Sequence, residues 1–122
     1  MTTDSEEFVL ELVTLSPETG DLVLEHLADH DEVQPQLLVT DLRILAYAMH
    51  ERDDSAALAL LLGLLDRALQ DGDRRLSNAI AVSFVDEARL DCRHPGFVAI
   101  WPAGLRFEAE RQQTSGPPKA IY

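Results

Sequence analysis

Only one cysteine, Cys92, occurs among the 122 residues, so the chain forms no internal disulfide. A lone cysteine is typical of proteins in a reducing compartment. No secretory leader is recognisable after Met1, and no apolar run approaches the roughly 20 residues that cross a bilayer. We therefore expect a cytoplasmic protein that does not associate with a membrane.

Aromatic residues are also scarce, at 6% of a chain that is 46% hydrophobic. Leucine, valine and alanine must then form most of the core, which is typical of a helical bundle. A length of 122 residues suits a single domain. We expect Trp101, the one tryptophan, to pack on the core because its neighbours are apolar, and the alternative is an exposed anchor for a partner.

Lysine and arginine are absent from the first 42 residues, which contain 11 acids. The rest of the chain has 11 acids and 10 basic residues, so the first third carries nearly all of the formal net charge of −12. A field of one sign repels nucleic acid and anionic membranes and attracts a basic partner. The alternative is an acidic surface that only keeps the protein in solution.

Signatures of catalysis are missing as well, with neither a nucleophile elbow nor a glycine-rich phosphate loop. Cys92 and His94 form a pair without the second pair that structural zinc needs. His26, Asp29 and His30 share one face of a predicted helix, but the general-base glutamate of a zinc-protease helix is absent. We interpret that face as solvated and polar, and we expect no enzyme activity, no metal and no cofactor.

The most apolar stretch is the segment 55–70, SAALALLLGLLDRALQ. Its first ten apolar positions leave no polar side on a helical wheel, whereas a surface helix shows one apolar stripe. We expect it to be a central helix covered by protein all round. Asp54 or Ser55 is the expected N-cap, and Gly72 is expected to end the helix in a left-handed conformation.

Caps and periodicity predict further helices around it, at residues 5–15, 17–30, 36–52, 73–89 and 102–113. The apolar run 78–85 also permits a buried strand, and 97–101 is either a short helical turn or extended. The inward faces that we expect are Phe8, Leu12 and Leu15 in the first helix, and Val23 with Leu27 and Leu24 with Ala28 in the second.

The predicted fold is therefore all-α, a compact antiparallel bundle of about five to six helices around the buried central helix 55–70. We assign residues 1–113 to a single helical domain. Residues 114–122 have linker composition and are expected to form a C-terminal tail.

The segment 78–86, NAIAVSFVD, resembles a family of small acidic, all-helical bacterial proteins of unknown function with the motif Asn-x-Ile-x-x-Ser-Phe-Val/Leu-Glu/Asp. The likeness covers roughly residues 17–111 and includes the proline-led start Pro17-Glu18, Glu25-His26-Leu27 at a helix end, and the stretch 35–42. The family usually has Glu where this chain has Asp86, and often Asn in place of Glu87. Proteins of this kind resemble the immunity members of bacterial toxin and immunity pairs. The resemblance implies no catalytic residues.

Together these features indicate a protein-binding module, most specifically an immunity protein that neutralises a basic toxin domain through an acidic face. The alternatives are an acidic protein that self-associates, as a homodimer for instance, or mimics DNA, and a metal-dependent enzyme that uses His26 with His30 or Cys92 with His94. The partner-binding residues that we predict, called the acidic set below, are Glu18, Asp21, Glu25, Asp29, Asp31 and Glu32, with Glu51, Asp53 and Asp54 as a second group.

Overall fold

The computed structural model describes residues 4–91, 93–116 and 118, and this part of the chain is an all-α bundle that contains no β-strand. The elements are α1 (Ser5–Leu15), α2 (Pro17–Asp29), α3 (Pro35–Glu51), α4 (Ser55–Asp71), α5 (Arg74–Ala79), a π-helix η1 (Ile80–Asp86), α6 (Glu87–Leu90), a 3-10 turn η2 (Val98–Ile100) and α7 (Ala103–Ser115). The predicted fold class is confirmed.

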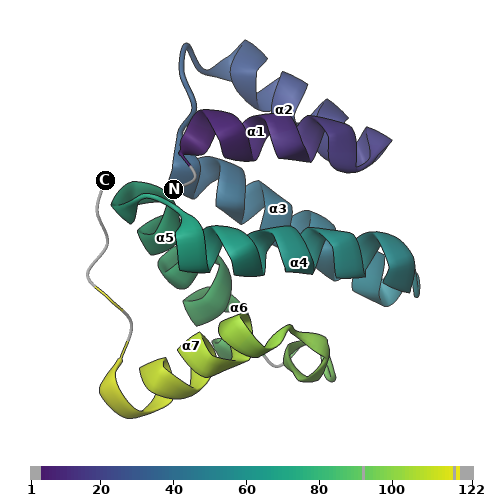
Figure 1. Cartoon of the computed structure of the whole chain (residues 1–122). Helices are drawn as coiled ribbons and strands as arrows, with labels where there is room; N and C mark the ends of the chain where they lie inside the picture. The colour runs from purple at the N-terminus through teal and green to yellow at the C-terminus, as the bar shows by residue number, and fades with distance from the viewer. Residues whose placement is uncertain (1–3, 92, 117, 119–122) are drawn as a thin grey trace.

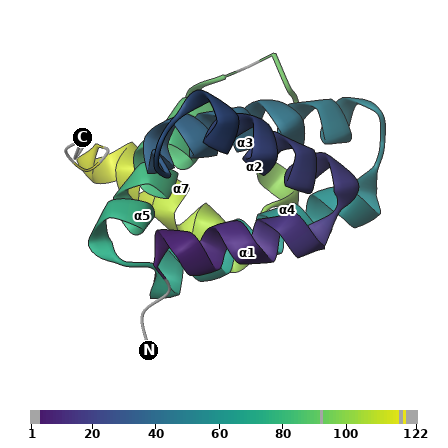
Figure 2. The same cartoon turned by 90° about the horizontal axis from the view of Figure 1, so that it is seen from above.

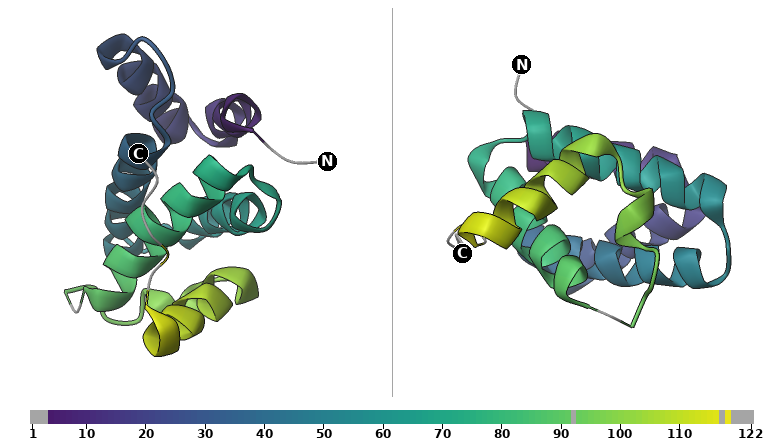
Figure 3. Two further views of the ribbon diagram at one scale, coloured as in Figure 1. Left: turned by 90° about the vertical axis from the view of Figure 1, so that its left-hand side faces the viewer. Right: turned by 90° about the horizontal axis from the view of Figure 1, so that it is seen from below.

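The helices lie in three layers (Figure 1). α1 and α2 form the first layer, α3 and α4 the second, and α7 the third, with η1 and α6 joining the second layer to the third. In the view from above, α1 lies over α4 and α2 lies near α3 (Figure 2). The two views in Figure 3 show the same stacking from one end and from below. Most of the acidic first third of the chain, namely α1 and α2, therefore forms one outer layer.

Polar caps start α1 and α2 where the sequence predicts them. The Asp4 carboxylate accepts a hydrogen bond from the Glu7 N–H at 2.9 Å. Ser16 and Thr19 form a reciprocal capping box that starts α2 immediately after α1 ends. Such caps satisfy N–H groups that have no partner within the helix. A single residue thus separates α1 from α2, and the two helices run antiparallel.

α4 is the central helix and contacts α1, α3, α5, η1 and α7. Its buried side chains include Leu58, Leu61 and Leu65. The expectation that protein covers it all round is wrong, because Ala56 and Ala59 are exposed and Leu60 is 56% exposed. The layers above and below leave one strip of the helix facing solvent.

Gly72 ends α4, but not in the left-handed conformation that we expected. Its φ of −67° is open to any residue. Glycine is required there for space, because a Cβ atom would lie 2.3 Å from the Ala68 carbonyl oxygen. The end of the helix at Gly72 was predicted correctly, but the predicted left-handed conformation was wrong.

The predicted helix 73–89 is one continuous helical stretch whose middle is the seven-residue π-helix η1. The alternative of a strand is wrong. Two η1 carbonyls accept bonds from other elements: Arg43 Nη1 donates to Ser83 at 2.6 Å, and Gln112 Nε2 donates to Ala81 at 2.9 Å. The apolar run 78–85 is thus explained by burial between α3, α4 and α7.

Trp101 is 2% exposed, which confirms that it packs on the core. Its ring contacts Phe84 and Phe97, with centroid distances of 5.4 and 5.7 Å. α7 begins after Pro102, which stands at the N-cap, and extends to Ser115, two residues into the expected tail. No helix in the described ranges has the length and apolar character needed to cross a membrane.

The inward face predicted for α2 is only partly right. Val23 is buried as expected, but Leu24 and Leu27 are 63% and 41% exposed, and Ala28 is exposed too. The face that packs inward consists of Thr19, Val23 and His26. Spacings of three and four residues are present on both the predicted face and the observed face of α2. Which of the two is buried depends on where α1 and α3 pack.

Candidate functional site

Four members of the acidic set form a continuous stripe along α2. Glu18, Asp21, Glu25 and Asp29 follow one another at intervals of three or four residues, and all four are exposed. Asp31 and Glu32 continue the stripe in the loop after α2 and are exposed as well. Because Glu18 and Asp29 are 11 residues apart on α2, the helical part of the stripe is about 16 Å long.

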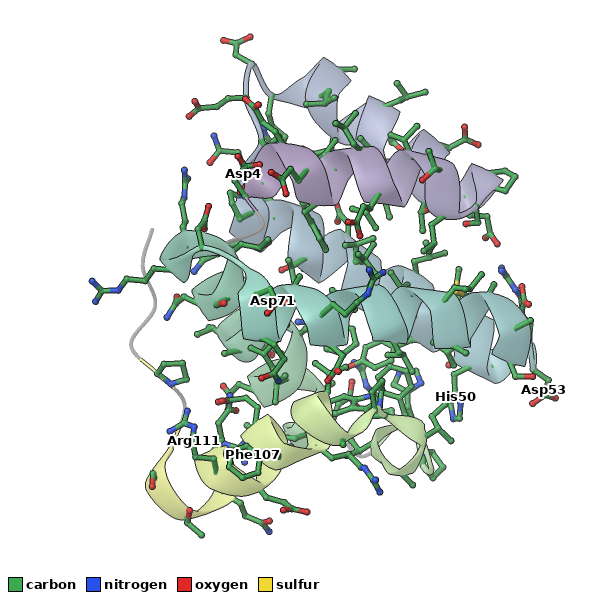
Figure 4. All side chains as sticks on the ribbon, in the orientation of Figure 1. Asp4, His50, Asp53, Asp71, Phe107 and Arg111 are labelled. Atoms are coloured by element: carbon green, nitrogen blue, oxygen red, sulfur yellow. The ribbon has the colours of Figure 1, made fainter. Side chains whose placement is uncertain are left out.

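The second group of the set lies at the turn between α3 and α4. Glu51 and Asp53 are exposed there and Asp54 is half-buried as the N-cap of α4. Asp53 has a φ of 58°, a left-handed conformation that aspartate tolerates better than most residues. Figure 4 shows its side chain at the outer end of the molecule.

Arg52 joins the two groups at one point. Its Nη1 donates to Glu18 Oε2 at 3.0 Å, and its Nη2 donates to Asp54 Oδ2 at 3.0 Å and also to Glu18 Oε1. These hydrogen bonds, that to Glu18 first, raise the pKa of Arg52. The structure therefore brings Glu18 and Asp54 together and neutralises part of their charge, whereas Asp31 and Glu32 lie at the far end of α2.

A groove of about 540 Å³ runs between α2 and α3 beside the acidic stripe. Three carboxylates surround it, those of Glu25, Asp29 and Asp41, together with His26 and His30. The apolar part of its lining consists of Leu22, Ile44, Leu45 and Ala48. The groove has no lysine or arginine in its lining, so it favours a cationic group that carries an apolar stem.

His26 is 4% exposed, so the expectation of a solvated polar face is wrong for this residue. Its Nε2 accepts a hydrogen bond from the Gln34 N–H at 3.0 Å. Burial and the nearby His30, whose ring centroid is 4.7 Å away, lower the pKa of His26, while Asp41 and Asp29 oppose this shift. The neutral imidazole therefore supports the loop after α2 as a hydrogen-bond acceptor.

The histidines and acids do not form a metal site in the part of the chain that the structure describes, where no group of three or more metal-binding side chains is suitably arranged. Cys92 lies outside the described residues. Its expected companion His94 stacks on Tyr47 with ring centroids 3.9 Å apart, and its Nδ1 lies 3.1 Å from Glu51 Oε1. Glu51 of the acidic set thus contacts the loop that precedes η2.

Two features near the acidic stripe were not predicted from the sequence. Asp41 completes the acidic lining of the groove, and the available signal was an acid directly before Leu42 in a predicted helix. The other feature is the exposure of Leu24 at 63% and Leu27 at 41% on α2. Their helical spacing suggested core packing, so no local signal set them apart.

Comparison of the chain with known protein families, with curated proteins and with solved structures finds no match.

Proposed function

We propose that this protein is a binding module that recognises a basic protein domain through its acidic outer layer, and most specifically that it is an immunity protein that neutralises a bacterial toxin. The observation that carries the proposal is the stripe on α2. Asp21, Glu25 and Asp29 are exposed, and no ion pair neutralises these three within the described residues. Uncompensated carboxylates in a row attract a cationic surface and suppress wrong partners.

Neutralisation would follow from occlusion. A toxin that acts on nucleic acid or on an anionic cofactor needs a cationic site, and an acidic layer can cover that site without chemistry of its own. The proposed role therefore requires no catalytic residue. It places the protein in the cytoplasm, in keeping with its single cysteine.

The proposal is tested by reversing the stripe in the full chain, with the triple variant Asp21→Lys, Glu25→Lys and Asp29→Lys. A matched control reverses three exposed acids elsewhere, Asp71→Lys, Glu87→Lys and Glu110→Lys, and has the same net charge. Each protein is used to capture partners from the lysate of the native cell at low and at moderate salt, and the captured protein is then produced alone and with each variant.

We expect the wild type and the control to capture the same basic protein in equal molar amounts and to suppress its toxicity in cells. The stripe variant should do neither. The proposal is wrong if the stripe variant captures and neutralises that protein as well as the wild type does, or if the wild type and the control elute alone.

Self-association is a second candidate, and a different face favours it. Phe107 on α7 is 69% exposed, and Ile100 on η2 and Leu90 on α6 are 50% and 66% exposed. Figure 4 labels Phe107 on α7. Light scattering after gel filtration should give a dimer mass for the wild type and a monomer mass for Phe107→Gln if this candidate is right.

A further inference from the structure

Four large apolar side chains lie exposed on the outer layer, which is unusual beside so many acids. Leu10 and Val13 on α1 are 66% and 44% exposed, and Leu24 and Leu27 on α2 are 63% and 41% exposed. We call these four residues the α1–α2 seam. Single exposed apolar residues are ordinary on a protein surface, but contiguous ones mark interaction sites.

The geometry of the two helices makes the four residues contiguous. α1 and α2 lie close together at Gly20, where a Cβ atom would lie 3.3 Å from the Val13 carbonyl oxygen. From that point the helices continue side by side and antiparallel (Figure 1). Leu10 lies one turn before Val13, while Leu24 and Leu27 lie one and two turns after Gly20 on the same side of α2.

The inner side of the same helix pair is already occupied. Phe8, Val9 and Leu12 of α1 and Val23 of α2 are buried against the second layer. The seam is therefore a separate apolar face that nothing else in the described chain covers. The seam extends along α2 from Gly20 to Leu27, seven residues, so it is roughly 10 Å long, which equals about two turns of a helix.

The rim of the seam is acidic. Glu6 and Glu7 flank it on α1, and Asp21 flanks it on α2, and all three are exposed. Neither helix contains a lysine or an arginine. An apolar strip with an acidic rim is complementary to a helix that has one apolar side and basic flanks.

We infer that the α1–α2 seam binds an amphipathic, basic α-helix of the partner protein. The apolar side of that helix packs on Leu10, Val13 and Leu24, and its lysine or arginine side chains reach the carboxylates of the rim. This inference rests on the proposed function, because it specifies how the acidic layer recognises its basic partner.

The acidic rim favours a basic helix over two other binding partners, a second copy of the chain and an anionic membrane. A second copy of the chain that docks seam to seam would bring the acids of both rims together, and like charges placed opposite each other destabilise a contact. An anionic membrane would be repelled by the same acids. A basic helix contacts the rim and the strip at once.

The test uses two synthetic peptides of one composition, both made of leucine and lysine. In the first, the residues are spaced so that a helix has one leucine face, and in the second the order is scrambled so that no such face forms. Binding to the full-length protein is measured by calorimetry, and circular dichroism reports whether the peptide becomes helical. The charge-reversed variant Asp21→Lys, Glu25→Lys, Asp29→Lys is included.

Two variants of matched exposure separate the seam from the rest of the surface. Leu10→Gln with Leu24→Gln alters the seam, and Leu37→Gln with Leu60→Gln alters leucines that are 50% and 56% exposed on other elements. All four positions are exposed, so each variant should fold, and circular dichroism verifies this. The same variants are then tested on any native partner that the acidic stripe captures.

We expect the amphipathic peptide to bind at least about tenfold more tightly than the scrambled one, and to become helical. The seam variant should weaken this binding by about tenfold or more, because two leucines lose their burial, and the control should leave it unchanged. Equal binding of both peptides, or no binding of either, would overturn the inference that the seam binds an amphipathic helix. If the charge-reversed variant alone loses the native partner while the seam variant keeps it, the proposed function stands and the seam inference fails.

Discussion

Gly72 lies where α4 turns into α5, and its lack of a side chain has one clear physical reason. A Cβ atom there would lie 2.3 Å from the Ala68 carbonyl oxygen and 3.2 Å from Leu76 Cδ2. Gly63, in the middle of the same helix, has nothing within 4 Å of the corresponding position. There is therefore room for a side chain at Gly63 but none at Gly72, the residue that ends the helix.

Alanine at these two positions should have opposite effects on stability. We expect Gly72→Ala to lower the free energy of unfolding by about 1–3 kcal/mol, because the backbone must shift to admit the methyl group. Gly63→Ala should raise it by about 0.5–1 kcal/mol, because alanine favours the helix and finds open space. Urea denaturation measures both, and effects of the same sign would contradict the steric argument.

His26 should make stability depend on pH. Burial and His30 hold its pKa in the folded protein below the ordinary value of 6.5. As the pH falls through that value, the unfolded chain takes up a proton that the folded chain refuses, so folding is disfavoured by acid. Stability should be fully present above the ordinary pKa and be lost as the pH falls below it.

The test compares the wild type with His26→Gln, in which the side chain still offers an acceptor to the Gln34 N–H. We expect the free energy of unfolding of the wild type to fall between about pH 7 and about pH 5, and that of the variant to fall less. Denaturation in urea across this range measures the slope. Parallel slopes would mean that other groups cause the acid sensitivity.

At the scale of elements, the π-helix η1 depends on side chains from distant helices. Gln112 on α7 is 1% exposed, donates to the Ala81 carbonyl, and accepts from Arg89 Nε at 3.0 Å. Arg43 on α3 supports the Ser83 carbonyl in the same way. A π-helix is an uncommon conformation, and these bonds hold it from two sides.

Removing one of these side-chain hydrogen bonds should lower the stability of the fold. We expect Gln112→Ala to lower the free energy of unfolding by about 1–3 kcal/mol, because the buried Ala81 carbonyl loses its side-chain donor. Gln113→Ala, at the exposed neighbouring position, is the control and should change it little. Thermal denaturation measures both, and similar effects at the two positions would argue against a role for the buried amide.

The elements also show what the sequence could and could not predict. Caps such as Asp4 and Ser16 act within four residues, so helix starts were predicted closely. The π-helix was not foreseen, because it depends on Arg43, which is 40 residues from its acceptor Ser83. The exposure of Leu24 was missed for a similar reason, since it depends on where α1 and α3 lie.

At the scale of the whole molecule, the acidic layer should make stability sensitive to salt. Asp21 and Glu25, and likewise Glu25 and Asp29, are like charges one helical turn apart, and each such pair costs a few tenths of a kcal/mol. Salt screens this repulsion. The arrangement that would attract a partner thus weakens the free protein at low ionic strength.

We expect the urea midpoint of the wild type to rise when NaCl increases from about 0.02 M to about 0.3 M. The neutral variant Asp21→Asn, Glu25→Gln, Asp29→Asn should be more stable at low salt and gain less from added salt. The matched variant Asp71→Asn, Glu87→Gln, Glu110→Gln should keep most of the salt effect. An identical gain in all three proteins would show that the stripe does not repel itself measurably.

The acidic part of the candidate site could be predicted, because its charge is visible in the sequence. A stretch of 42 residues without a basic side chain becomes an acidic layer wherever its helices pack, so Asp21, Glu25 and Asp29 were found. The groove with Asp41 and the bridge through Arg52 join residues from different helices. Only the packing of α2 against α3 brings them together.

The layering has one more consequence, for synthesis on the ribosome. α1 and α2 are translated before α3 and α4, yet Phe8 and Leu12 of α1 are buried with residues of those later helices. Until those helices emerge, both apolar sides of the nascent hairpin face solvent. The newborn chain therefore passes through a stage at which chaperones can bind it, and its closely spaced carboxylates keep neighbouring chains apart.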